Sequence, residues 1–210
     1  MRVRVSRWLW ALGAGTVLMF GITAVRKGIT MAELAEGLVP WTAVAAAAVL
    51  HELGHIAAAW GLGVRVRRLR VDLFGARMEL EGLLSYGQEF FTAAGGPLVN
   101  FLCAALVHPR VSRGDWPWGS LFLGASLVLG GVNLLPVGTL DGGRMLRSGA
   151  AFLWGDRVST ALWRGITMVF LGLLWLLTVY ALLRAGQMVS WFVFCLCLLL
   201  RSIAGEDGGS

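Results

Sequence analysis

The chain alternates long apolar stretches with short polar connections. Six stretches of about 18 to 25 residues are long enough to cross the hydrocarbon core of a bilayer as helices. They cover residues 8–25, 39–63, 90–107, 119–137, 165–183 and 186–203. The pattern therefore predicts an all-α membrane protein with about six transmembrane helices.

Residues 64–89 follow a different rule. Val64–Val71 and Ala76–Gly82 each alternate apolar and polar residues, and Phe74-Gly75 lies between them. A period of two indicates strands, so we expect a small membrane-associated β-hairpin after the second span. Its open edge could pair with a substrate held in extended form. Its arginines could equally anchor it to anionic lipid headgroups, and neither role excludes the other.

Composition supports a membrane protein. Of the 210 residues 57% are hydrophobic and 14% are charged, and the mean hydropathy is +0.73. We expect one polytopic membrane domain over residues 1–204, followed by a short polar tail at 205–210.

The distribution of positive charge predicts orientation. A net charge of +6 could indicate nucleic-acid binding, but the basic residues flank apolar spans, which favours the positive-inside rule and no nucleic-acid partner. With the N-terminus inside, thirteen of the eighteen Lys and Arg residues fall on the inner side and five on the outer side. Six spans with both termini cytoplasmic follow.

The second apolar stretch contains His51-Glu52-Leu53-Gly54-His55. The i, i+4 spacing places both imidazoles on one helical face, where they can take two corners of a zinc tetrahedron. Glu52 lies near the open corner and is the candidate base for a metal-activated water. Ionisable residues inside a span are costly and indicate a functional site.

Other interpretations of this motif exist. The residues could be buried without a function, or they could belong to a metal transporter or channel, which would usually show ligands at more than one depth. The fold could also bind membrane partners without cutting them. Loss of Glu52 or of a ligand would mark such a protein, and neither is lost.

A third ligand is expected because a catalytic zinc usually has three protein ligands and one water. His108 falls at the outer end of its span, at the wrong depth. Asp141 stands out among the inner acidic residues because it follows a helix broken by Pro136 and Gly138, with glycines behind it. The alternative role of Asp141 is an N-cap for the next helix, and spacing leaves both roles open.

Three motifs resemble the site-2 protease family of intramembrane zinc metalloproteases. They are the His51–His55 pentad, Gly96-Pro97-x-x-Asn100, and Asn133-x-x-Pro136-x-x-x-Leu140-Asp141-Gly142-Gly143. The arginine-rich segment Arg65–Glu81 and the run Val132–Pro136 further resemble the sporulation branch of that family, whose enzyme removes the pro-sequence of a sigma-factor precursor.

The resemblance implies a zinc endopeptidase with one Zn2+ per chain. His51, His55 and Asp141 would be the ligands and Glu52 the catalytic base. Asn133, Asn100, Gly96 and Pro97 are candidates for binding the substrate or stabilising the oxyanion. Many family members carry a PDZ domain, for which residues 64–89 leave no room, and the sporulation enzymes typically carry a CBS domain, which we do not expect here.

The resemblance also implies partners and a location. The substrate would be a membrane-tethered protein: most favourably a sigma-factor precursor, alternatively a single-span anti-sigma factor or a remnant signal peptide. Membrane lipids surround the chain, and any inhibitor is expected to be a membrane protein. The expected location is a bacterial cytoplasmic or forespore-type membrane, and the sequence makes no prediction of the oligomeric state.

Overall fold

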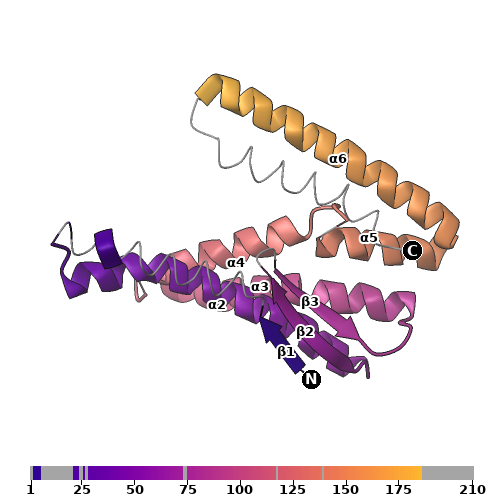
Figure 1. The fold of residues 1–210 in the computed structure, drawn as a ribbon, viewed down its shortest axis with the longest axis horizontal. Coiled ribbons are helices and arrows are strands. Elements are labelled where there is room, and N and C mark those ends of the chain that lie inside the picture. Colours follow the sequence, from indigo (N-terminus) through magenta and orange to yellow (C-terminus); the bar gives the residue numbers. More distant parts are fainter. Residues whose placement is uncertain are drawn as a thin grey trace.

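The computed structural model describes residues 2–5, 21–23, 26, 28–72, 75–116, 118–138 and 140–185. Its elements in chain order are the strand β1 (Arg2–Val5), the helix α2 (Met31–Gly61), the strands β2 (Val66–Asp72) and β3 (Gly75–Leu80), and the helices α3 (Tyr86–Ser112), α4 (Gly119–Asn133), α5 (Asp141–Trp154) and α6 (Asp156–Ala185) (Figure 1). A helical protein with one small sheet agrees with the predicted fold class.

Three of these helices are long and apolar enough to cross a membrane. The candidate spans are Ala35–Gly61, Tyr86–Ser112 and Asp156–Tyr180, and α4 is a shorter apolar helix. The chain is a multi-pass membrane protein. The spans predicted at 8–25 and 186–203, and the polar tail, lie outside the described residues.

The helices differ in how they pass glycine and proline. α3 runs unbroken through Gly96 and Pro97. Further along, the chain divides at Gly155, between α5 and α6. Gly155 has a φ of +81°, a left-handed conformation that glycine adopts at little cost, so α5 ends there and α6 begins.

The predicted hairpin forms, and a third strand joins it. β2 and β3 pair antiparallel, and β1 pairs parallel with the other edge of β2. Val66 packs against Ala59 at the end of α2, with Met78 and Leu80 beside it, so one face of the sheet covers the end of the helix. The outer edge of β2, which a lone hairpin would leave free, is therefore occupied by the chain itself.

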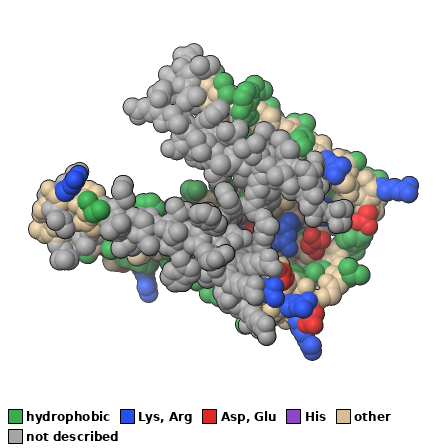
Figure 2. Space-filling view, in the orientation of Figure 1, with side chains coloured by type: hydrophobic (Ala, Val, Ile, Leu, Met, Phe, Trp, Pro, Cys, Tyr) green, Lys and Arg blue, Asp and Glu red, His purple; other side chains and the backbone are tan. Residues whose placement is uncertain are grey.

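Charged side chains gather at the sheet end of the molecule (Figure 2). Arg65, directly before β2, and Arg67, the second residue of β2, are both exposed. Arg157, at the start of α6, is also exposed. The hydroxyl of Tyr86, at the start of α3, donates to the Asp156 carboxylate at 2.7 Å and ties the starts of α3 and α6 together. This end therefore has the composition expected at a membrane surface.

Small residues bring α2 and α3 into backbone contact. A Cβ built on Gly54 would clash with the carbonyl oxygen of Gly95, and one built on Gly95 would come within 2.5 Å of the Gly54 oxygen. Ala47, Ala59 and Ala93 are also buried. Such small-residue contacts let helices pack closely in a membrane. In this fold they set the distance between the helix that carries the histidines and the helix behind them.

The segment between α4 and α5 folds into tight turns. Val137 is fully buried against Leu171 of α6, and the hydroxyl of Thr167 donates to the Pro136 carbonyl at 3.1 Å. A Cβ on Gly142 would clash with the Leu134 carbonyl, and one on Gly143 with that of Val137. The two glycines therefore allow the first turn of α5 to lie directly against the backbone of residues 134–137. This contact fixes the position of Asp141, the first residue of α5.

Candidate metal centre

His51 and His55 lie one turn apart on the same face of α2, as their spacing predicts. Their Nε2 atoms are 3.2 Å apart, and each residue is only 4% exposed. The rings meet edge to face, with centroids 4.8 Å apart. Two buried imidazoles thus present the same ring nitrogen to one point.

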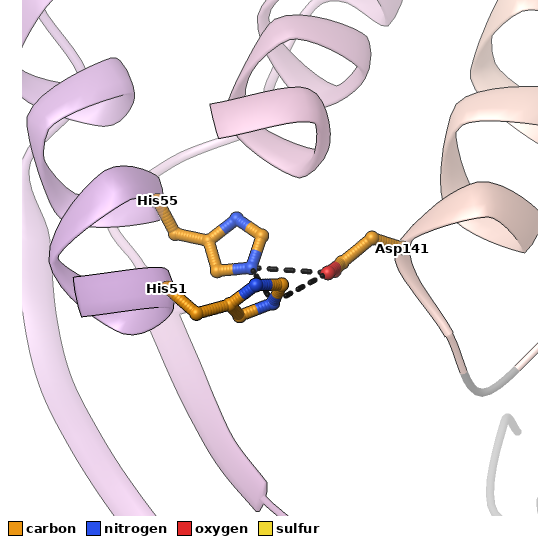
Figure 3. A group of neighbouring side chains, drawn as sticks. All are labelled: His51, His55 and Asp141. Carbon is orange, nitrogen blue, oxygen red and sulfur yellow. Dashed lines mark hydrogen bonds and ion pairs between the residues drawn. The ribbon is translucent and has the colours of Figure 1, made fainter. Parts of the chain in front are cut away.

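Asp141 reaches that point from α5 (Figure 3). Its Oδ2 lies 3.0 Å from Nε2 of His51 and 3.1 Å from Nε2 of His55. The N-cap of α5 is Leu140, and Asp141 is the first residue of the helix. The carboxylate therefore contacts the histidines and does not cap the helix. Its other oxygen, Oδ1, lies 3.8 Å from Nη1 of Arg144.

The backbone of α3 fixes the proton on His55. Nδ1 of His55 lies 2.8 Å from the carbonyl oxygen of Thr92. The N–H of Gly96 also points at this Nδ1, at 3.3 Å. The shorter contact is with a carbonyl, which can only accept, so it places the proton on Nδ1 and leaves Nε2 with a lone pair, and the longer approach of the Gly96 N–H is then not a hydrogen bond. Metal-binding histidines characteristically donate their other ring N–H in this way.

The donor set fits one zinc ion. Ligand atoms about 2.0–2.1 Å from a tetrahedral zinc are about 3.3 Å from one another. The three separations here are 3.0, 3.1 and 3.2 Å. Lone pairs and a carboxylate that converge in a buried place repel each other unless a cation or proton lies between them. Within the described ranges, His51, His55 and Asp141 are the one group of metal-binding side chains this close together.

Gly96 forms the wall behind the cluster. A Cβ at this position would clash with Nε2 of His55 and come within 2.7 Å of Nε2 of His51. Any other residue would therefore intrude on the space beside the converging nitrogens. The sequence listed Gly96 and the buried Pro97 among candidates for binding the substrate, but the geometry gives Gly96 a role in making room for the metal.

The other predicted site residues lie in different surroundings. Glu52 is half-buried on α2 between the two histidines and outside the three-residue cluster. Asn133 is half-buried, and its side-chain amide donates to the Leu129 carbonyl at 3.0 Å, one turn back along α4. Asn100 is fully buried, and its Nδ2 lies 3.3 Å from Nδ1 of His51. His108 is exposed beside Ser112, away from the cluster, as its depth indicated.

Two partners were not foreseen from the sequence. The Thr92 carbonyl orients His55, and Arg144 lies near Asp141. A backbone carbonyl carries no sequence signal. Arg144 directly follows the Asp-Gly-Gly motif, three residues after Asp141 and hence on the same helical face, so its position could have indicated this contact.

The chain is similar in sequence to zinc metalloproteases and to a sporulation protein. No family model matches the chain. It is 30% identical over 117 residues to a zinc metalloprotease of Methanocaldococcus jannaschii, covering 53% of this chain and 34% of that protein. It is 35% identical over 102 residues to stage IV sporulation protein FB of Bacillus subtilis, covering 47% and 35%. Both relatives support the resemblance to the site-2 protease family that the three motifs indicate.

The solved structure of a site-2 protease from Methanocaldococcus jannaschii has the same fold. It matches with a TM-score of 0.58 and 20% identity, over 90% of this chain and 84% of that one. The chain spans only 34% to 40% of the length of the curated relatives it matches. The His-His-Asp cluster is compatible with the single zinc site that a site-2 protease requires.

Proposed function

We propose that this chain is an intramembrane zinc metalloendopeptidase that cuts a membrane-associated protein. The observation that carries the proposal is the convergence of two imidazole nitrogens and one carboxylate oxygen in a buried place, with Glu52 on the turn between the histidines. A transporter would be expected to show further ligand groups at other depths, and the described residues contain one group.

His51, His55 and Asp141 would hold the zinc ion. When bound, zinc supplies Lewis acidity, which activates water and polarises a carbonyl. Glu52 would take the proton of the attacking water and deliver it to the nitrogen of the leaving amine, so that the proton is conserved over the reaction. Gly96 keeps side-chain atoms away from the ligand nitrogens.

The substrate would be presented in extended form. A peptide bond inside a helix has its carbonyl hydrogen-bonded and its faces covered, so cleavage requires local unwinding. β1 already occupies one edge of the sheet. β1 and β3 each have an outer edge with no partner strand among the described residues. An added substrate strand would pair with one of these two edges, and the edge of β3 belongs to the hairpin that the sequence predicts for this role.

A sigma-factor precursor is the favoured substrate. The motifs that resemble the sporulation branch support it, and one matched relative is named a stage IV sporulation protein. A single-span anti-sigma factor or a remnant signal peptide is the alternative. The same resemblance supports a bacterial cytoplasmic or forespore-type membrane. The distribution of Lys and Arg supports cytoplasmic termini.

Co-expression with a sigma-factor precursor bearing its pro-sequence tests the proposal. We expect the wild-type chain to produce the shortened product on a gel and Glu52→Gln to produce none, because the amide cannot accept the proton. Glu52→Gln should still bind zinc, since Glu52 is outside the ligand set. Cleavage by both proteins would remove Glu52 from the mechanism. If neither cuts this precursor, single-span membrane peptides test the alternative substrates.

A further inference from the structure

Asn100 lies where a membrane helix would normally place an apolar residue. It is fully buried in α3, 3.3 Å from Nδ1 of His51, and its Oδ1 has no hydrogen-bond partner among the residues that the structure describes. Across from it, Gly130 of α4 leaves room: a Cβ there would come within 3.3 Å of the Asn100 Cβ. A buried amide that two helices accommodate needs a reason to be there.

Asn100 shares one face of α3 with two other residues of the centre. Thr92, Gly96 and Asn100 are four residues apart, so they lie above one another on the helix. Thr92 meets His55, Gly96 lies against both histidines, and Asn100 meets His51. α3 thus places the Thr92 carbonyl and the Gly96 N–H near Nδ1 of His55 and the Asn100 amide near Nδ1 of His51. Gly96 puts no side chain beside the two rings.

The orientation of the amide decides whether His51 can bind a metal. With Nδ2 facing His51, the ring nitrogen Nδ1 must accept, which places the ring proton on Nε2 and removes the lone pair that faces Asp141. Rotating the amide by 180° exchanges oxygen and nitrogen with almost no change in shape. Oδ1 then accepts from Nδ1–H, and Nε2 of His51 presents its lone pair as Nε2 of His55 does.

We infer that Asn100 is a positioning residue that accepts the Nδ1 proton of His51 and so holds this ring in its metal-binding tautomer. The inference rests on the proposed zinc site. It assigns Asn100 a role behind the ligand rather than at the substrate. After the rotation, the amide nitrogen is the atom without a partner in the described part of the chain, so a residue with only acceptor oxygens should serve equally well.

Zinc affinity of the purified full chain, measured by competition with a chromophoric chelator, tests this inference without an activity assay. Asn100→Leu keeps the volume but loses the acceptor, and we expect zinc affinity to fall about 10- to 100-fold, the usual cost of losing such a partner. Asn100→Asp keeps the acceptor and should bind zinc within about 3-fold of wild type or more tightly, because a carboxylate also accepts from a ligand histidine. Ser126→Ala is the control: it removes a fully buried hydroxyl of α4 that has no hydrogen-bond partner in the described part of the chain, and it should leave zinc affinity unchanged.

Nitrogen-15 NMR of the histidine rings gives an independent readout. We expect the His51 proton on Nδ1 in the zinc-loaded wild type and in Asn100→Asp. Equal weakening of zinc binding by Asn100→Asp and Asn100→Leu would overturn the inference alone, as would unchanged affinity in Asn100→Leu. If the wild type and Ser126→Ala both fail to bind zinc, the proposed function and this inference fall together.

Discussion

At the scale of single residues, two conditions allow the three ligand atoms of the centre to lie close together. The three ligand atoms can approach within 3.0–3.2 Å because a cation can separate them and because Gly96 contributes no side chain. Gly96 belongs to α3, the helix that packs against the histidine-bearing α2, and is not one of the ligands.

The role of Gly96 gives the first prediction. Gly96→Ala places a methyl group against Nε2 of both histidines, so it should abolish zinc binding while the helices still form. The measurement is zinc content after purification, with helical content by circular dichroism. Gly124→Ala is the matched control, because a Cβ at this α4 position meets nothing within 4 Å. Retained zinc in Gly96→Ala would contradict the geometry described here.

The sequence predicted features that depend on residues near one another in the chain, and it did not predict contacts between distant segments. The His51–His55 spacing defines one helical face without further knowledge, and the glycines after Asp141 indicated close approach of that carboxylate. The contact of Asn100 with His51 depends on how α3 lies beside α2, which no local pattern encodes. Strand β1 escaped prediction for the same reason, since four residues become a strand only by pairing with β2.

At the scale of helices and strands, the Gly54–Gly95 contact sets the separation of α2 and α3. Gly54 lies inside the metal-binding pentad, between the histidines. Glycine at position 54 therefore allows the two helices to pack closely, while His51 and His55 in the same segment of α2 belong to the metal centre.

Gly54→Ala should consequently destabilise the protein. The added methyl group would meet the Gly95 backbone, and overpacking of this kind costs about 1–3 kcal/mol. Thermal unfolding of the detergent-solubilised chain measures the effect. Gly172→Ala is the control: its Cβ meets nothing within 4 Å, so the substitution should be neutral or stabilising by about 0.5–1 kcal/mol in a helix. Equal stability of the two variants would show that the helices can separate without cost.

The start of α2 gives a prediction on pH. Glu33 accepts from the backbone N–H of Thr30 at 2.8 Å and from its hydroxyl at 2.9 Å, and these hydrogen bonds, the backbone one first, hold the pKa of Glu33 below its usual value. The resulting stabilisation is present above the unfolded pKa and is lost as pH falls through the folded one. Thr30→Ala keeps the N–H and removes the hydroxyl, so an NMR titration should show the Glu33 pKa rising part of the way. An unchanged pKa would mean that the hydroxyl contributes nothing.

At the scale of the whole molecule, most of the charged side chains that Figure 2 shows gather at one end. The sheet, the start of α3 and the α5–α6 junction share the charged end (Figures 1 and 2). Under the proposed orientation this end faces the cytoplasm, and the turn after α3 faces the opposite side.

Cysteine labelling tests that orientation. Leu83, after the sheet, and Asp115, after α3, are both exposed. In intact cells a membrane-impermeant maleimide should modify Asp115→Cys and should reach Leu83→Cys only after the membrane is opened. The unsubstituted chain measures background labelling of its own cysteines. The reverse pattern would invert the orientation.

The parallel pairing of β1 with β2 also has a consequence for biosynthesis. Arg2–Val5 leaves the ribosome well before Val66–Asp72, so β1 must wait for its partner strand. Pairings between segments far apart in the sequence form slowly. β1 is therefore translated before β2 but ordered only after it. Until it joins the sheet, one edge of β2 stays open to strands of other nascent chains.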